Sequence, residues 1–425
     1  MVDFRPIHGC RFNLGIVEDM ANVLCPPYDM IDSDLQKDLK SLSQYNAVHL
    51  EGAEQPDPMD PEKSYLEASS LYRSWLEHNV LQQDEKPNYY LMSYGYEFDG
   101  NHKQQLALFG GIAVENYDKK TVLPHEFTRE PAVQDRVKLL ESCKAQFSPI
   151  MSLYRDASQT LRPLLTKVMT NTPDLEVKDS IQGQICFWVI SELEAREAIR
   201  QFFIDKPIFL ADGHHRYEAA LRYRSDDQNS MDEANNFVMM ALVEFDDPGL
   251  QLLPYHRGIG NLSSENLEKI QYELNNLFDS RPFDLSAKGV DVLTKEIAEL
   301  GRSQHVVGII GPEADHAEIL ILKKELDWKQ WGALAVSEAW VIEEKVLKPV
   351  LGNEATRQVD YSHDPQGLRD RINHKDLQIA FVLKPFPMDT FEEIVGGGQR
   401  LPSKSTFFFP KLPTGLVIHR LEGNV

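Results

Sequence analysis

The sequence predicts an α+β fold in which mixed or antiparallel sheets are combined with helices. Several pairs of segments have the composition of β-hairpins, and segments with helical spacing of apolar residues lie between them. Hairpins mixed with helices favour this class over a doubly wound parallel sheet. A chain of 425 residues is also longer than a single hydrophobic core usually supports, which is roughly 250–300 residues. We therefore expect two closely packed domains.

The expected domain boundary lies after residue 225. It divides the chain into a first domain with an inserted hairpin, residues 1–225, and a second α+β domain, residues 226–425. The polar stretch from Arg224 to Asn236 is the best candidate for the junction, although a surface loop would have the same composition.

The first 60 residues are rich in loop-forming residues. Two consecutive prolines in the segment from Cys25 to Asp29 fix an extended backbone and present Tyr28 and Asp29 rigidly. These two side chains either line a pocket or only organise the turn. Apolar residues then recur at near-helical spacing between Ser64 and Leu81, which predicts a helix.

Three pairs of segments have the composition of hairpins. The turn sequence from Asp99 to His102 makes the first pair the strongest. The pairs are residues 88–98 with 104–116, 237–245 with 250–255, and 306–310 with 318–322. Helices are expected at residues 267–278 and 331–351, and further strands at residues 378–383, 405–409 and 416–420.

A change from strand to helix near the middle of the chain is the most informative pattern. The apolar run from Pro207 to Ala211 predicts a short buried strand, and residues 217–224 are good helix formers. The polar residues 212–216 are then the turn between them. At such a turn the first helical N–H groups lack partners and the helix dipole is positive, so the turn predicts an anion-binding site.

Each residue of this turn has a possible role in binding phosphate. Gly213 allows close approach of the backbone, and Arg216 with one or both of His214 and His215 can reach phosphate oxygens. Asp212 can cap the helix or hold Mg²⁺. The alternative is an aspartate cap with two surface histidines and a solvated arginine. A zinc site from the two histidines is disfavoured, because neighbours on a helix point in different directions and no His-x-x-x-His pattern is present.

The charge balance argues against nucleic acid as a partner. The chain has 44 Lys and Arg against 66 Asp and Glu, a net charge of −22, and we found no concentrated basic patch. Since phosphate neutralisation dominates non-specific DNA binding, we predict no appreciable affinity for duplex DNA at physiological salt. Micromolar, salt-sensitive binding in a gel-shift assay would contradict this.

Cysteine placement and hydropathy suggest a cytoplasmic protein. The cysteines are scattered without a Cys-x-x-Cys pair, so neither a disulfide framework nor a zinc ribbon is indicated; they are Cys10, Cys25, Cys143 and Cys186. No secretory leader and no long apolar run are present. We therefore expect no membrane partner.

Three separated motifs resemble the uncharacterised family catalogued as domain-of-unknown-function 1015. They run from Cys25 to Asp29 (CPPYD), from Asp212 to Ala220 (DGHHRYEAA) and from Phe408 to Gly415 (FFPKLPTG), so the resemblance nearly spans the chain.

The central turn also resembles the Gly-x-His-Arg or Gly-x-x-Arg segment of the ParB and sulfiredoxin superfamily, in which such a turn carries nucleotide phosphates. This resemblance implies a ParB/sulfiredoxin-like phosphate-binding domain in the first half of the chain. The superfamily includes kinases that convert free serine to O-phosphoserine, and proteins resembling the whole chain have been linked to pyrophosphate-dependent serine phosphorylation. A basic helix-turn-helix and a cysteine in the turn are both absent, which argues against DNA partition and sulfinic-acid repair.

Phosphoryl transfer to a hydroxyl needs a proton acceptor and cations around the transferred group. The segment from Leu123 to Glu130 offers Glu126 as the base, with His125 second, and Thr128 as a polar contact. The alternative is a charged surface loop. His215 is a further candidate for a catalytic role.

Three cations elsewhere are candidates for holding a phosphate or the substrate. Arg136 follows the Glu126 segment closely and is a candidate to clamp a phosphate or the substrate carboxylate. Lys411 lies on a proline-rich loop, and Arg257 follows an apolar segment. The resulting hypothesis is a small-molecule phosphotransferase that phosphorylates L-serine, with pyrophosphate or a nucleotide as donor and Mg²⁺ as cofactor. A phosphatase or other phosphoester hydrolase, or a non-catalytic nucleotide-binding regulator, remain the alternatives. The oligomeric state is not indicated.

Overall fold

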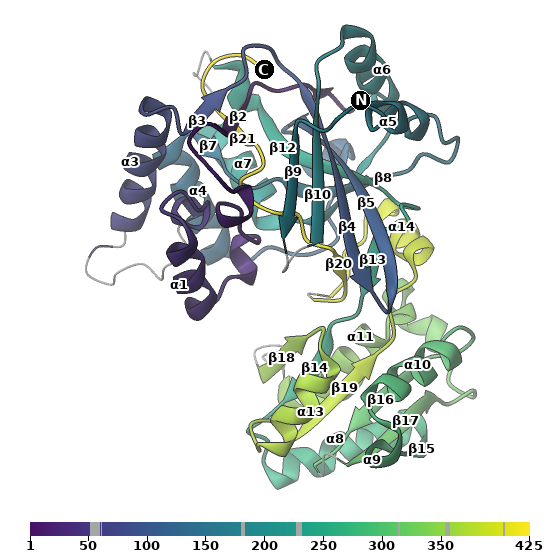
Figure 1. Cartoon of the computed structure of the whole chain (residues 1–425). Coiled ribbons are helices and arrows are strands. Elements are labelled where there is room, and N and C mark those ends of the chain that lie inside the picture. Colours follow the sequence, from purple (N-terminus) through teal and green to yellow (C-terminus); the bar gives the residue numbers. More distant parts are fainter. Residues whose placement is uncertain are drawn as a thin grey trace. The chain divides into compact units, whose positions relative to one another are not determined.

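The computed structural model forms two compact units (Figure 1). Unit 1 contains Met1–Gln251 and Pro410–Val425, and unit 2 contains Leu252–Phe409. The residues that the structure describes are 1–51, 60, 62–179, 183–226, 232–312, 315–352, 358–402 and 404–425.

Unit 1 is built on a mixed sheet that is nine-stranded over its described residues. Its order is β6 (Val122–Leu123), β11 (Ile208–Asp212), β8 (Ile150–Tyr154), β12 (Phe237–Glu244), β5 (Asn101–Ala113), β4 (Tyr89–Phe98), β10 (Gly183–Ile190) and β9 (Leu175–Asp179), with β1 (Phe4–Arg5) also on β5. β11 is parallel to β6 and antiparallel to β8. This mixture of pairings, together with the helices, confirms the α+β class.

Alternation of side chains along β11 explains why this strand is buried on both faces. Ile208 and Leu210 belong to the main core cluster of unit 1, whereas the ring of Phe209 packs edge-on against Phe245 at 5.1 Å between centroids. Successive strand residues point to opposite faces of a sheet, so the apolar run predicted from sequence fills two layers. The turn that follows β11 is therefore attached to a rigid strand.

Helices and a small second sheet complete unit 1. The helices are α1 (Ser33–Leu42), α2 (Val48–Glu51), α3 (Lys63–Glu77), α4 (Glu130–Cys143), α5 (Arg162–Val168), α6 (Leu193–Phe203) and α7 (His214–Asp226). α4 and α7 pack side by side through Val133, Val137 and Ala219 (Figure 1). The small sheet has the order β3 (Leu81–Gln83), β2 (Gly9–Phe12), β21 (Ile418–Arg420) and β7 (Ala145–Gln146). It joins the last residues of the chain to the first.

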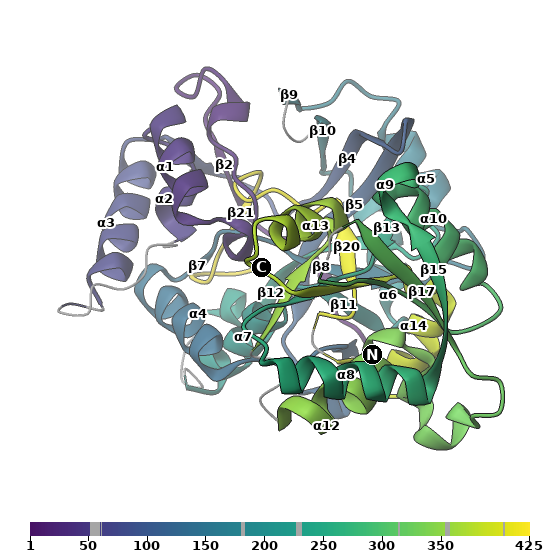
Figure 2. The same cartoon turned by 90° about the horizontal axis from the view of Figure 1, so that it is seen from below.

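Unit 2 contains an antiparallel sheet with helices on both faces (Figure 2). Its order is β15 (Phe278–Asp284), β17 (His316–Leu322), β16 (Val306–Ile310), β19 (Ile379–Leu383), β14 (His256–Ile259) and β18 (Val359–Ser362). Val307 faces the core that contains α8 (Ser264–Leu277), and Val306 faces the core that contains α10 (Val290–Leu300) and α13 (Pro365–Asn373). The other helices are α9 (Leu285–Lys288), α11 (Glu338–Val341), α12 (Lys348–Leu351) and α14 (Met388–Gly396).

Two of the three predicted hairpins are confirmed. β4 pairs with β5 across Asp99 and Gly100, whose φ angles of 48° and 71° suit a tight hairpin turn, and β16 pairs with β17. The predicted hairpin of residues 237–245 with 250–255 is wrong. β12 is a central strand with β5 on one side and β8 on the other, so neither of its edges is open to the later segment. That segment forms β13 (Gln251–Leu253), which pairs with β20 (Phe407–Phe409).

The predicted helix of residues 331–351 is interrupted. Short 3₁₀ helices cover Trp328–Trp331 and Ala333–Val336, separated by Gly332 with a φ of 105°. Ser337 then caps α11, and a π-helical turn, Ile342–Leu347, joins α11 to α12. Gly332 adopts a backbone conformation that L side chains rarely allow, and it is where the helical pattern breaks.

The compact units do not follow the expected boundary after residue 225. β12 completes the sheet of unit 1, which extends that unit to Gln251, and the chain returns to unit 1 at Pro410. Of the proposed junction from Arg224 to Asn236, residues 227–231 lie outside the described residues. In the described parts of the chain, no helix is both long and apolar enough to cross a membrane.

Candidate functional site

The turn between β11 and α7 is shorter than the sequence indicated. β11 continues through Asp212 and α7 begins at His214, so Gly213 alone forms the turn, with a φ of 95°. A Cβ atom on Gly213 would lie 2.9 Å from Nε of Arg216. Tyr217 N–H donates to the Gly213 carbonyl at 3.0 Å, which starts the helical hydrogen bonding. The predicted strand, tight turn and helix are confirmed, and they leave the first N–H groups of α7 at the end of a buried strand.

Asp212 lies between two cations. One carboxylate oxygen accepts a hydrogen bond from Nη2 of Arg216 at 2.6 Å, and the other accepts one from Nζ of Lys411. Burial alone would raise the pKa of Asp212, but Lys411 and Arg216 outweigh burial and hold this pKa well below its usual range. Each oxygen thus has one cationic partner, and the expected Mg²⁺ contact of Asp212 stays a prediction.

Arg216 is buried rather than solvated. Only 10% of its side chain is exposed, and Nη1 donates to the Pro149 carbonyl at 2.6 Å. β8 starts just after Pro149 and runs antiparallel to β11, which brings this carbonyl to the end of β11. Nε of Arg216 has no hydrogen-bond partner among the described residues, and Arg216 lines a cavity of about 30 Å³.

Arg136 lines the same cavity but is already paired with carboxylates. Its guanidinium donates to Glu51 at 3.0 Å and to Asp135 at 2.7 Å, and it lies 4.0 Å from the ring centroid of Tyr28. Arg136 is therefore the centre of a buried ion-pair cluster, and its expected phosphate contact stays a prediction. Burial also raises the pKa of Tyr28 to about 12, while Asp29 is exposed.

The contact between Glu51 and Arg136 was not predictable from the sequence. These residues are 85 positions apart. Glu51 is the last residue of α2, and its four residues are too few to show a helical pattern of apolar side chains. A buried glutamate needs a cation or a hydrogen-bond donor nearby, but the sequence does not say which one.

His214 and His215, the first two residues of α7, hold the loop that contains Glu126. Nε2 of His214 accepts the backbone N–H of His125, and Nε2 of His215 accepts the backbone N–H of Arg129, both at 3.2 Å. Each imidazole that accepts through Nε2 carries its proton on Nδ1 and is neutral. Both side chains therefore position this loop, and their expected contact with phosphate oxygens stays a prediction.

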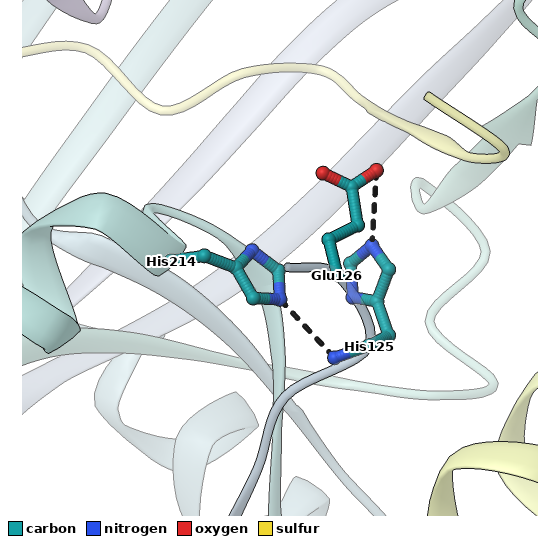
Figure 3. Close-up of side chains that lie close together, drawn as sticks. All are labelled: His125, Glu126 and His214. Atoms are coloured by element: carbon teal, nitrogen blue, oxygen red, sulfur yellow. Dashed lines mark hydrogen bonds and ion pairs between the residues drawn. The ribbon is translucent and has the colours of Figure 1, made fainter. Parts of the chain in front are cut away.

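His125 and Glu126 lie beside His214 (Figure 3). Nδ1 of His125 donates to the Leu210 carbonyl at 2.6 Å, and its Nε2 lies 3.8 Å from Oε1 of Glu126. Burial lowers the pKa of His125 to about 4, so the imidazole is neutral at pH 7. Glu126 keeps 19% of its side chain exposed, which gives a ligand access to the carboxylate. The expected loop contact Thr128 is half-buried.

The sheet topology explains why His125 and Glu126 lie beside His214. β6 and β11 are parallel neighbours, so the loop that leaves β6 and the turn that leaves β11 lie at the same edge of the sheet. His125 and Glu126 follow β6, and Gly213 and His214 follow β11. The structure therefore brings the Glu126 segment and the turn together.

The first and last sequence motifs also meet within unit 1. Cys25 and Thr414 form an isolated antiparallel bridge, with N–H to carbonyl distances of 2.8 and 3.3 Å. This pairing fixes the segment that carries Lys411 to Asp212. All three motifs thus contribute to the surroundings of the turn.

Arg257 lies on β14 of unit 2, where its fully buried side chain donates from Nε to Glu343 at 2.9 Å and from Nη1 to the Tyr255 carbonyl at 2.7 Å. These contacts give Arg257 a structural role inside unit 2. Its expected contact with substrate stays a prediction.

The chain belongs to the family described as "Protein of unknown function (DUF1015)", whose model matches residues 4–346. No curated protein sequence matches it. Similar solved structures include a conserved hypothetical protein from Pyrococcus furiosus, with 12% identity over 73% of this chain and 95% of that chain and a TM-score of 0.36. A free serine kinase mutant in complex with AMP has 12% identity over 73% and 92%, with a TM-score of 0.38. SbnI from Staphylococcus aureus, truncated at its C-terminus, has 11% identity over 72% and 85%, with a TM-score of 0.37.

Proposed function

We propose that this protein is a small-molecule phosphotransferase that binds its phosphate donor at the start of α7 and uses Glu126 as general base. The observation that carries the proposal is the convergence of three distant segments on Gly213. The loop after β6 brings Glu126, the first turn of α7 brings Arg216, and the C-terminal return brings Lys411.

The donor site would combine the start of α7 with two cations. Lys411 and Arg216 both pair with Asp212 and bring their charges to the end of β11. The positive end of the helix dipole of α7 adds to them. Pyrophosphate or a nucleotide fits such a site, and Mg²⁺ would come with the donor, held mainly by phosphate oxygens.

The reaction we propose transfers a phosphoryl group to the hydroxyl of free L-serine. The serine oxygen bonds to phosphorus, the bond from phosphorus to the bridging oxygen of the donor breaks, and the hydroxyl proton passes to Glu126. The donor leaves as phosphate or as the shortened nucleotide. The turn's resemblance to the superfamily that includes free-serine kinases supports serine as the acceptor.

Phosphorus NMR tests this function directly. Purified protein is incubated with L-serine, Mg²⁺ and each donor in turn, and we expect O-phosphoserine from pyrophosphate or from a nucleoside triphosphate. Release of phosphate without phosphoserine would instead indicate a hydrolase. No turnover with any donor would favour a binding protein.

Replacing Arg216 with alanine should weaken binding of the donor by about 1.5–3 kcal/mol, because a charge-assisted hydrogen bond is lost. Calorimetry with phosphate, pyrophosphate and ATP measures the change. Arg222→Ala is the matched control, since Arg222 lies on the same helix but pairs with the exposed Glu130. Equal affinities for Arg216→Ala and the unchanged protein would give Arg216 a purely structural role.

A further inference from the structure

We propose that His125, Glu126 and His214 form a binding site for a divalent transition-metal ion, with Zn²⁺ the best match. One ligand atom from each residue lies within 4.8 Å of the other two (Figure 3). A small movement of these side chains would bring all three atoms to coordination distance. The proposal does not depend on phosphoryl transfer.

The ligand types select the metal. Two imidazoles and one carboxylate suit zinc and its neighbours, whereas Mg²⁺ prefers oxygen ligands in octahedral geometry. This site is therefore distinct from the Mg²⁺ that would accompany a phosphate donor. Three protein ligands also leave a coordination position open, as in catalytic rather than structural zinc sites.

The orientation of His125 is the second observation. Its Nδ1 donates to the Leu210 carbonyl, so in the neutral imidazole Nε2 carries the lone pair. That lone pair lies 3.8 Å from Oε1 of Glu126, which is also an acceptor. A cation between the two groups would relieve their repulsion. A metal-bound histidine whose other nitrogen donates to a backbone carbonyl is also the usual outer arrangement of such sites.

His214 supplies the third ligand at the expense of an existing contact. Its Nε2 accepts the His125 N–H at 3.2 Å, and a metal on His214 would compete with this hydrogen bond. Metal binding should therefore shift the loop that carries Glu126. The sequence pattern disfavoured a zinc site from His214 and His215, and the structure offers His214 instead an imidazole 89 residues earlier in the chain.

Calorimetry with Zn²⁺ on the full chain, after treatment with a chelator, tests the site. We expect a single zinc ion to bind, and a large excess of Mg²⁺ should not displace it. His214→Ala and Glu126→Gln should each weaken zinc binding by more than about 10-fold, because even outer-shell changes cost about 10–100-fold. Cobalt absorption spectra give an independent readout of the ligand set.

His102→Ala is the control for adventitious binding at the surface. His102 lies 3.1 Å from Glu97, and their side chains are 66% and 70% exposed, so this pair has similar ligands without burial. Its loss should leave zinc affinity unchanged. Thermal melts establish whether each variant folds. If His214→Ala does not fold, the test rests on Glu126→Gln, because the Glu126 carboxylate is partly exposed and its replacement should not prevent folding. Absent binding to the unchanged protein, equal affinity in Glu126→Gln, or loss of binding in His102→Ala would each overturn the proposal.

Discussion

Glu126→Gln should lower the turnover of phosphoryl transfer by about 10²–10⁴-fold, the usual contribution of a general base. Glutamine has nearly the same shape as glutamate but cannot accept the hydroxyl proton. Donor binding should stay nearly unchanged, because the cations and the helix N–H groups that we assign to the donor lie on other residues. Turnover is measured by phosphorus NMR and donor affinity by calorimetry, both in zinc-free buffer.

Glu130→Gln is the control for this experiment. Glu130 begins α4 only a few residues later, but it is exposed and pairs with Arg222. We expect normal turnover from this variant. Full activity in Glu126→Gln would show that another group is the base, and His125 would be tested next.

Arg136→Met should destabilise the protein by about 3–5 kcal/mol, because it leaves a buried carboxylate without its cation. Glu51 is only 2% exposed, and one of its oxygens already has no hydrogen-bond partner among the described residues. The substitution also removes the guanidinium from the face of Tyr28. Urea denaturation, followed by a signal from unit 1, measures the change.

Arg222→Met is the matched control for stability. Arg222 also pairs with a glutamate of α4, but at 32% and 63% side-chain exposure, where water already screens the charges. We expect little change from it. If both substitutions lowered the free energy of unfolding equally, the buried pair of Arg136 and Glu51 would not stabilise the protein more than an exposed ion pair does.

Local patterns in the sequence determined the strand, turn and helix around Gly213. An apolar run, a glycine and a series of helix formers are adjacent in the chain, so their conformations follow from neighbouring residues. The hairpin of β4 and β5 was predictable for the same reason, since Asp99 and Gly100 carry the turn signal. The anion-binding character of the turn could likewise be proposed from sequence.

Pairing between distant strands was not accessible in this way. The segment of β12 has the composition of a hairpin strand, but whether it pairs with its successor depends on which sheet edges other strands have taken. Because β12 belongs to the sheet of unit 1, that unit extends to Gln251 and does not end at residue 225.

The composition of the site was decided by tertiary structure alone. Lys411 meets Asp212 across 199 residues, and His214 meets His125 across 89. The sequence identified all four as polar residues in suitable segments, but it did not indicate that Lys411 and Arg216 would share Asp212 or that His214 would support the Glu126 loop. Such contacts arise because parallel β6 and β11 end at one edge of the sheet, and the C-terminal segment is fixed there by Cys25. Neither effect leaves a periodic signal in the chain, since each depends on how the elements pack.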